Sequence, residues 1–556
     1  MRGPLRWSLL AAAVAVAAGL VAWAFNPAPH SGGDNAAYLA LADALANGRG
    51  YVDAYDPADQ PHTKYPPLFP ALLAGFALLG AATWPVFKGV VAVATVLMVG
   101  FSFVWAERRL GPWSAFAVAV LVAAAPAVVY YSHWILSDPV FVLLILVSLW
   151  ALETGEARSW HRGWIALGLG AALAAYFTRS AGLPLLIAVL GWLALRRRFR
   201  TLAVAAAVFV LPAVAWWIRG RGEGVGDYVS EFWMVDPYQP GLGTVGVAGL
   251  AGRAVGNAVT YVTGHLPDAV VGAQGAWTMA LGIGLVVAVA WGWGAKIRKA
   301  PGAAELFLPL YVALILVWPE VWGGDRFVLP VLPLCLVYGT VALQGWTRRM
   351  GGGARVVAAA ALVLLLLPAL GSWLGTVRDA RACASAAATS GPFACYGEGV
   401  AEFAGAAEWM GRTLPEGSAV MTRKPRIFYV MSGGVPSRTF PFDGDPDVQL
   451  DEADAVGARY VLLDRWDVQA SRFVGAAVRS RPGAFCFVRD FGAGSGGGAQ
   501  LLGILPKDER GSGDVSRDGS VSIPRCPGSY VVEGADDGGH APATSSLIPL
   551  FSRSPR

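Results

Sequence analysis

Hydrophobic residues occur along the chain in long runs that short polar segments separate. Eleven runs have about the length needed to cross roughly 30 Å of hydrocarbon. They lie near 7–25, 84–105, 113–131, 135–152, 163–178, 180–195, 201–218, 274–295, 303–320, 326–346 and 355–377. The first run follows Arg2 and Arg6, as in a signal peptide, but it is long and lacks a small-residue cleavage site, so we interpret it as a retained span. The pattern predicts an α-helical polytopic membrane protein with about 11 transmembrane helices.

Composition agrees with this class. Of the 556 residues, 55% are hydrophobic and 15% are charged, and the mean hydropathy is +0.50. The net charge of +5 comes from basic residues that are clustered between apolar runs, where they act as orientation signals. We therefore expect membrane lipids around the chain and no nucleic acid partner.

The distribution of basic residues predicts an orientation. With a cytoplasmic N-terminus, most arginines and lysines of the short loops, including the cluster 196–198, lie inside. An odd number of spans then places the region after 377 outside. We expect a multi-pass protein of the cell membrane with an extracytoplasmic C-terminal domain.

The sequence divides into three regions. We expect a transmembrane domain at 1–377, with a first outer loop at 26–83 and a large outer loop at 219–272. Helical and strand patterns alternate after it, which predicts a small α/β domain at 378–491. These patterns are a helix at 401–414, a strand at 418–422, a helix at 424–431 and a strand at 459–464. The remainder, 492–556, is rich in Gly and Ser and predicts a partly disordered tail.

Cysteine positions give an independent indication of the compartment. Cys335 lies within a predicted span, and the other four follow it in the C-terminal region. An even number of cysteines in the compartment predicted to be oxidising favours two disulfides. Proximity favours Cys383–Cys395 and Cys486–Cys526, although four cysteines allow three pairings, and four free thiols remain the alternative.

Polar side chains occur at the predicted outer ends of the helices. They are Asp34 and Lys64 in the first outer loop, and Asp138, Arg179 and Arg326 at the ends of later spans. Each has a simpler interpretation, because aspartates often cap helices and interfacial arginines often extend toward water. Ionisable groups at membrane depth are costly and usually functional, so their gathering on one face predicts a site. The aromatic residues of 219–272 could shape an acceptor groove or form a surface hairpin.

Five motifs in order resemble the GT-C glycosyltransferases. They are GGD-x3-Y with LA-x-x-L-x-x-G-x-G-Y, then KYPPLFPALLA, LSDPVF, YFTRS and DRFVLPVLPL. Among these enzymes the sequence is most similar to the protein mannosyltransferase and aminoarabinose transferase branch. The likeness covers nearly all of the predicted spans, and the first loop is its most specific part.

The resemblance implies an inverting transfer of a sugar from a polyprenyl-phosphate carrier to an acceptor at the extracytoplasmic face. By resemblance, Asp34 is the catalytic carboxylate, and a carboxylate there can take the proton of an acceptor hydroxyl. Lys64, Arg179 and Arg326 are expected to bind the donor phosphate through charge-assisted bonds. Tyr38, Tyr65 and Asp138 are expected to contact substrate.

The sequence departs from the eukaryotic protein mannosyltransferases in ways that leave the acceptor open. Asn35 follows Asp34 where those enzymes usually have a second acid, and the soluble domain is C-terminal rather than an inserted β-trefoil. The acceptor could therefore be a cell-envelope glycan, a lipid or a protein. The transferred group could be a hexosyl or a pentosyl unit.

Other classes and cofactors were weighed on the same residues. His30, His62, His133 and His265 show no metal-ligand spacing, and we expect no required metal or other cofactor besides the lipid-linked sugar donor. The alternative to a sugar transferase is a ligase that transfers a whole polymer from a lipid carrier, because it would use the same displacement at a lipid-linked phosphate. A lipid or sugar transporter should carry its charges near the midplane, whereas here they lie at the rim.

Overall fold

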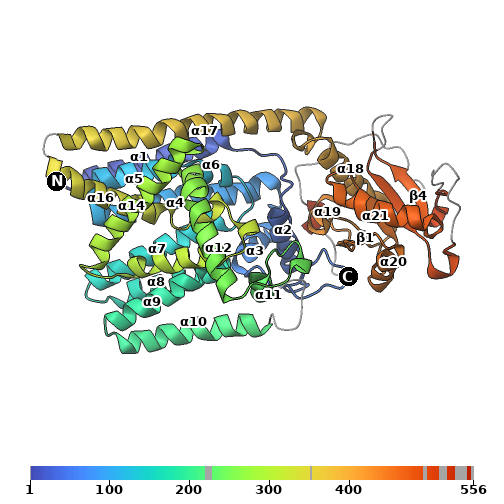
Figure 1. Cartoon of the computed structure of the whole chain (residues 1–556), viewed down its shortest axis with the longest axis horizontal. Coiled ribbons are helices and arrows are strands. Elements are labelled where there is room, and N and C mark those ends of the chain that lie inside the picture. The colour runs from blue at the N-terminus through green and yellow to red at the C-terminus, as the bar shows by residue number, and fades with distance from the viewer. Residues whose placement is uncertain are drawn as a thin grey trace. The chain divides into compact units, whose positions relative to one another are not determined.

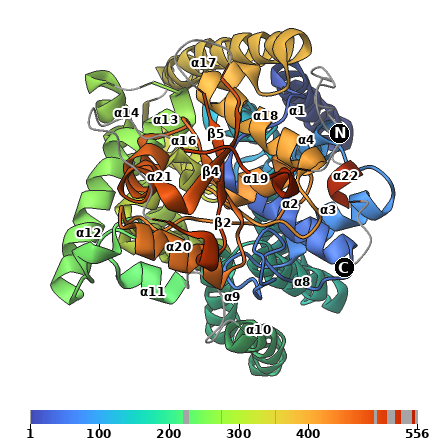
Figure 2. The same cartoon turned by 90° about the vertical axis from the view of Figure 1, so that its right-hand side faces the viewer.

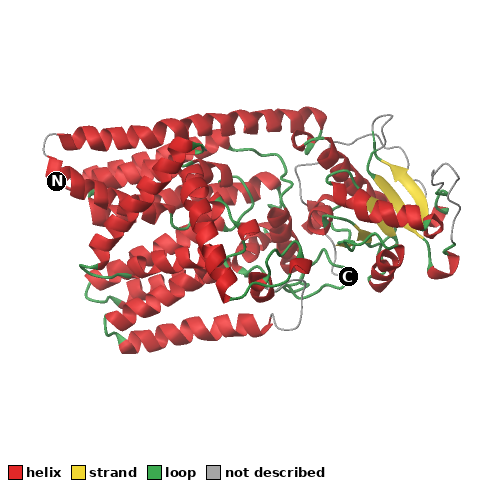
Figure 3. Cartoon of the chain, in the orientation of Figure 1, coloured by secondary structure: helices red, strands yellow, loops and turns green. Residues whose placement is uncertain are grey.

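The apolar runs fold into long helices, and strands occur in one part of the described chain (Figures 1 and 3). The computed structural model describes residues 2–219, 228–273, 275–350, 353–492, 498–511, 523–531 and 548–551. The chain divides into two compact units, which are described separately. The helical unit comprises 1–25, 63–69 and 88–381, and the mixed unit comprises 26–62, 70–87 and 382–556.

The helical unit contains most of the membrane-length helices. Its helices are α1 (Arg2–Ala24), α5 (Pro112–Ala124), α6 (Pro126–Tyr131), α7 (Asp138–Ala157), α8 (Arg162–Thr178), α9 (Leu183–Leu195), α10 (Phe199–Arg219), α11 (Tyr228–Trp233), α12 (Val247–Thr260), α13 (Leu266–Val271), α14 (Ala276–Ile297), α15 (Ala303–Val317) and α16 (Leu332–Met350). Short turns are η1 (Ser180–Gly182), η2 (Pro240–Leu242), the π-helical η3 (Tyr261–His265), η4 (Glu320–Trp322) and η5 (Asp325–Val328). Three helices include residues of both units: α3 (Leu68–Leu78), α4 (Trp84–Leu110) and α17 (Ala354–Ser390).

Most of each of the eleven predicted spans falls on helix in the described part of the chain, and position 274 of the span at 274–295 lies outside that part. Among the described residues, six helices are by themselves long and apolar enough to cross a membrane: α1, α4, α7, α10, α14 and α17. The other predicted spans fall on shorter or interrupted helices. For example, the run at 113–131 is broken between α5 and α6, because Pro126 disfavours helical backbone at Ala125, whose ψ is 124°.

Close helix packing in the helical unit depends on small residues. Helices α7 and α8 form an antiparallel hairpin, in which a Cβ on Gly168 would come within 2.6 Å of the Leu152 side chain. The Ser148 hydroxyl donates to the Gly168 carbonyl across the same contact, at 2.8 Å. Small residues let helix backbones approach in this way, so the hairpin fixes the start of α7 beside the end of α8.

The mixed unit combines the first loop with the C-terminal region. Its helices are α2 (Gly33–Ala46), α18 (Glu398–Thr413), α19 (Pro425–Met431), α20 (Pro446–Ala455), α21 (Val468–Ser480) and α22 (Ile548–Phe551), with short turns η7 (Ala394–Tyr396), η8 (Pro482–Ala484), η9 (Lys507–Glu509) and η10 (Gly528–Tyr530). Its strands are β1 (Val420–Met421), β2 (Ser437–Arg438), β3 (Tyr460–Leu463), β4 (Phe485–Asp490) and β5 (Gln500–Ile504).

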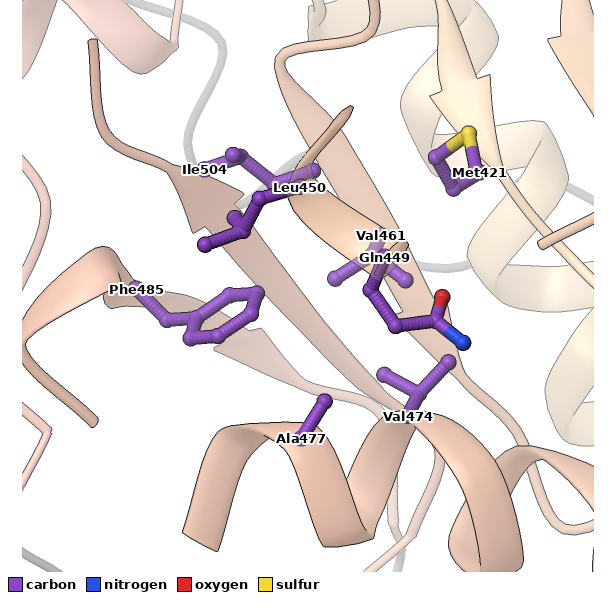
Figure 4. A pocket seen from close by; sticks show the side chains of 8 residues that line it. All are labelled: Met421, Gln449, Leu450, Val461, Val474, Ala477, Phe485 and Ile504. Carbon is purple, nitrogen blue, oxygen red and sulfur yellow. The ribbon is translucent and has the colours of Figure 1, made fainter. Parts of the chain in front are cut away.

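These strands form one five-stranded sheet in the order β2-β1-β3-β5-β4. Strand β1 is parallel to β2 and β3, and β5 is antiparallel to β3 and β4. Figure 2 shows α20 and α21 on one side of the strands and α18 and α19 on the other. The core on the α20 and α21 side encloses a small pocket (Figure 4), lined by Met421, Gln449, Leu450, Val461, Val474, Ala477, Phe485 and Ile504.

The elements expected between 398 and 464 are confirmed. Both predicted helices and both predicted strands occur, as α18, α19, β1 and β3. Strand β5 lies in the segment that we assigned to the Gly/Ser-rich tail. Its apolar residues Leu501, Leu502 and Ile504 are flanked by glycines, which conceal the strand in a composition-based prediction. Parts of the tail (493–497, 512–522, 532–547 and 552–556) and of the large outer loop (220–227) lie outside the described residues.

Both disulfides have the pairing that sequence proximity favoured. Cys383 is bonded to Cys395 and Cys486 to Cys526, and Cys335 is a free thiol. The second bond joins β4 to a segment of the expected tail, so this part of the tail belongs to the folded domain.

Candidate active site

Three charged residues far apart in sequence meet in the helical unit. Arg179 Nη1 lies 2.9 Å from Asp138 Oδ2, and Arg326 Nε lies 2.8 Å from the same oxygen. The Asp138 side chain is 1% exposed, whereas Arg179 and Arg326 are 15% and 18% exposed. We call these three residues the Asp138 cluster.

The local fold explains why the cluster forms. Asp138 is the first residue of α7, and Arg179 follows the last residue of α8 in extended backbone, so the hairpin brings them together. Arg326 comes from η5, which precedes α16. The interpretation of Asp138 as a helix N-cap is wrong, because Ser137 holds that position and the carboxylate binds the two arginines.

Neighbouring groups hold the arginines in place. Arg179 Nη1 also donates to Ser137 Oγ at 3.3 Å, and its guanidinium lies 5.9 Å from the centre of the Phe327 ring. Asp325 Oδ1 accepts hydrogen bonds from the Tyr131 hydroxyl, at 3.0 Å, and from the Arg326 backbone N–H, at 2.8 Å. Within the Asp138 cluster, two guanidinium groups share one carboxylate, so its formal charge is +1.

Lys64 is held by a different set of side chains. Its ammonium donates to both carboxylate oxygens of Glu231 on α11, at 2.7 and 3.0 Å. The ammonium also lies 4.6 Å from the Trp322 ring and 5.2 Å from the Tyr228 ring, within the range of cation–π attraction. The next residue, Tyr65, is half-buried and precedes the two prolines that lead into α3.

Asp34 lies in the first turn of α2 in the mixed unit. The interpretation of Asp34 as an N-cap is wrong, because Gly32 occupies that position. Asp34 is half-buried, and Tyr38, one turn further along, is 1% exposed.

The chain is similar to one known protein family and to several solved structures. Residues 64–218 match the family described as dolichyl-phosphate-mannose-protein mannosyltransferase. The structure resembles ArnT from Cupriavidus metallidurans bound to undecaprenyl phosphate, with a TM-score of 0.54 and 16% identity over 90% of this chain and 98% of that chain. The chain has the GT-C fold. No match was found among curated protein sequences.

A second structure with the GT-C fold comes from an archaeon. The oligosaccharyltransferase of Archaeoglobus fulgidus, solved with a tethered acceptor peptide, has a TM-score of 0.53 and 12% identity over 90% of this chain and 74% of that chain. With its apolar helices and small C-terminal sheet, the present chain is a multi-pass helical membrane protein with a C-terminal α/β domain.

Sequence reasoning missed several residues near the predicted ones. Glu231 and Trp322, which hold Lys64, lie in the short elements α11 and η4, which are too short to show a periodic pattern, although Glu231 lies within the aromatic segment of 219–272. Asp325 is adjacent to Arg326 in the GGDRF sequence and could have been named with it. Only the fold shows that Tyr131 donates to Asp325.

In the described part of the chain, no three His, Cys, Asp or Glu side chains come together as a set that could hold a metal ion. The expectation that the protein requires no metal stays a prediction.

Proposed function

We propose that the protein is a membrane glycosyltransferase that moves a sugar from a polyprenyl-phosphate carrier to an acceptor at the extracytoplasmic face. The observation that carries this proposal is the Asp138 cluster, in which one buried carboxylate orients two partly exposed arginines. A phosphate group would meet a fixed pair of planar donors with a positive formal charge. Hydrogen bonds between a guanidinium group and a phosphate are stronger where water is scarce.

The donor class is supported by what similar structures contain. The ArnT structure is bound to undecaprenyl phosphate, and a structure of the Archaeoglobus oligosaccharyltransferase contains a dolichol-phosphate. The present chain has the same fold and carries the arginines on its own helix ends. Lys64 is a third proposed phosphate ligand, which would have to exchange its bond with Glu231 for one with the donor.

The proposed reaction is a single displacement with inversion. The acceptor oxygen attacks the anomeric carbon while Asp34 takes its proton, and the bond from that carbon to the phosphate oxygen breaks with the electron pair going to the phosphate. Because the leaving group is an anion, it needs cations and donors rather than an acid. Arg179 and Arg326 would stabilise the growing charge on the phosphate.

For the acceptor, we propose only a chemical class. It provides a nucleophilic hydroxyl, from a cell-envelope glycan, a lipid or a protein. The orientation with a cytoplasmic N-terminus would place the helix ends that carry Asp138, Arg179 and Arg326 on the extracytoplasmic face, where lipid-linked sugars are available without nucleotide donors.

The test is turnover by the Asp34→Asn variant reconstituted in lipid nanodiscs with a polyprenyl-phosphate sugar. Loss of a general base costs about 10²–10⁴-fold in rate, and donor affinity should change little because Asn keeps the size of the side chain. Asp447→Asn is the matched control, since Asp447 is also an acid in the first turn of a helix of the mixed unit and is well exposed. Full turnover by Asp34→Asn would remove Asp34 from the mechanism.

A further inference from the structure

The loop that carries Asp34 is packed on the C-terminal α/β domain within the mixed unit. Residues 26–62 and the segment from η7 to β2 belong to the same compact unit, although more than 300 residues separate them. Three separate sets of contacts hold them together. The sequence alone indicates no role for this domain, so these contacts bear on what it does.

The first set of contacts holds the beginning of the loop. The Tyr396 hydroxyl donates to the Pro29 carbonyl at 2.9 Å, and its ring meets the His30 ring edge to face at 5.8 Å. Tyr396 lies in η7 directly after Cys395, whose disulfide to Cys383 fixes this turn to α17. The backbone just before α2 is thereby fixed.

The second set of contacts holds the other end of α2. Tyr429, on α19, donates its hydroxyl to Asp43 Oδ2 at 2.6 Å and accepts from Arg49 Nη1 at 3.2 Å. Tyr429 and Asp43 are each 1% exposed. Asp43 Oδ1 also accepts from the Asn47 amide at 2.7 Å. A hydrogen bond to a buried carboxylate is costly to lose, because the acceptor is then left unsatisfied.

The third set of contacts holds the return of the loop. The Ser437 backbone N–H donates to the Tyr55 carbonyl at 2.7 Å, and Arg438 forms an ion pair with Asp56. Both donors belong to β2, next to β1 in the sheet. The loop is therefore tied to the sheet as well as to α19.

We propose that Tyr429 is a positioning residue, through which the α/β domain fixes α2 and thereby Asp34. The inference rests on the proposed function, since it gives Asp34 the role of base. Asp34 and Asp43 are nine residues apart on one helix, which corresponds to about 13 Å. A helix of this length is rigid, so a shift at Asp43 is transmitted to Asp34.

Electrostatics keeps Tyr429 in the form that this role needs. Burial, together with the adjacent Asp43 carboxylate, raises the pKa of Tyr429 above its ordinary value. The phenol therefore stays neutral at physiological pH and donates its proton to Asp43. Arg49, which donates to the same phenol oxygen, is paired in turn with Asp59 of the loop.

The first experiment compares Tyr429→Phe with Tyr460→Phe. Tyr460 is fully buried in the same domain and donates its hydroxyl to the Tyr530 carbonyl at 3.0 Å, so its variant loses an equivalent bond away from the loop. A displaced catalytic group costs up to about 100-fold in rate. We expect kcat to fall about 10- to 100-fold in Tyr429→Phe with little change in the KM for the donor, and to stay near wild type in Tyr460→Phe. Equal losses of kcat in both variants would reduce Tyr429 to a structural residue and overturn the proposal.

The second experiment does not depend on transfer. Hydrogen exchange of the α2 backbone amides should become faster in Tyr429→Phe and stay at the wild-type rate in Tyr460→Phe. Unchanged exchange in Tyr429→Phe would overturn the positioning role. If wild-type protein transferred no sugar while α2 exchange responded as expected, the proposed function would fail and the tie between domain and loop would stand.

A double-mutant cycle tests the route through Asp43. If Tyr429 acts through Asp43, the combination of Tyr429→Phe with Asp43→Ala should accelerate α2 exchange no more than the more severe single variant does. Additive effects would show that the two residues act separately and would contradict the proposed route.

Discussion

Helix α7 carries a charged cluster near each of its ends, and the two clusters have opposite composition. At its start, Asp138 is shared by Arg179 and Arg326. About 22 Å further along the helix, Glu153 and Glu305 share Arg109. We call these last three residues the Arg109 cluster. One carboxylate with two cations gives a formal charge of +1, and one cation with two carboxylates gives −1.

This difference suggests separate tasks for two clusters that each contain a buried carboxylate. Arg109 lies 4.4 Å from the Trp105 ring, and Glu305 also accepts from the Tyr338 hydroxyl at 2.8 Å. The Arg109 cluster thereby ties together α4, α7, α15 and α16. The Asp138 cluster has two guanidinium groups for one carboxylate, which is the ratio that suits an anion. The proposed phosphate site is thus distinguished from a structural tie by its charge ratio rather than by its burial.

The largest effect should come from breaking the Arg109 cluster. Arg109→Gln leaves Glu305, which is 3% exposed, and Glu153 without their shared cation. Breaking a buried ion pair from one side costs about 3–5 kcal/mol, because a charge remains buried without its partner. We expect a marked fall in the thermal unfolding midpoint in nanodiscs, with normal donor affinity in the fraction that stays folded.

Arg196→Gln is the matched control for that variant. Arg196, at the end of α9, pairs with Glu156 of α7 at 2.6 Å, but both side chains are more than a quarter exposed. Such pairs contribute less than about 1 kcal/mol. Equal destabilisation by the two variants would contradict the assignment of the Arg109 cluster as the tie.

Another buried carboxylate, that of Asp464, sharpens the comparison, because no arginine or lysine forms an ion pair with it among the described contacts. Asp464 follows β3 and is 2% exposed. Its Oδ1 accepts from the Trp466 backbone N–H at 3.0 Å, and its Oδ2 has no hydrogen-bond partner among the described residues. Burial raises the pKa of Asp464 to about 6, an effect that Asp467 increases and that Lys424 and Arg423 oppose.

Stability of the sheet should therefore depend on pH. The pKa of Asp464 is higher in the folded state than the value of about 3.9 in an unfolded chain, so protonation favours folding. The contribution is complete below about pH 4 and is lost as the pH rises through 6, which corresponds to about 2–3 kcal/mol. Asp464→Asn keeps the Oδ1 acceptor but cannot ionise, so it should remove this dependence.

Hydrogen exchange of the β3 amides at pH 5 and pH 7.5, corrected for intrinsic rates, measures the effect. The wild-type protein should lose protection at the higher pH, and Asp464→Asn should not. The same loss in both proteins would show that Asp464 does not titrate in this range.

The sequence predicted the elements of the site better than their connections. Asp138 and Arg179 could be named because they stand at the ends of apolar runs that form a hairpin. The bond of Glu231 to Lys64 could not be foreseen, because it joins residues 167 positions apart, one in the first outer loop and one on the short helix α11. The alternation of helical and strand patterns along the C-terminal region predicted β1 and β3, whereas the glycines around β5 concealed that strand.

The role of the C-terminal domain was also beyond the sequence. Tyr429 lies in a predicted helix, yet its hydroxyl meets Asp43 across a separation of 386 residues. A single sequence has no periodic or local signal for such a contact. The N-cap interpretations of Asp34 and Asp138 failed for a related reason, since a one- or two-residue shift of a helix start changes the position that a side chain takes.

The most direct test of the proposed phosphate site is the affinity of Arg326→Gln for undecaprenyl phosphate in nanodiscs. Asp138 keeps Arg179 as a partner in this variant, so folding should be nearly unchanged. We expect binding to weaken at least about tenfold, which corresponds to 1.4 kcal/mol, whereas Arg196→Gln should bind as the wild-type protein does. Wild-type affinity in a folded Arg326→Gln protein would contradict the assignment of the Asp138 cluster to the donor phosphate.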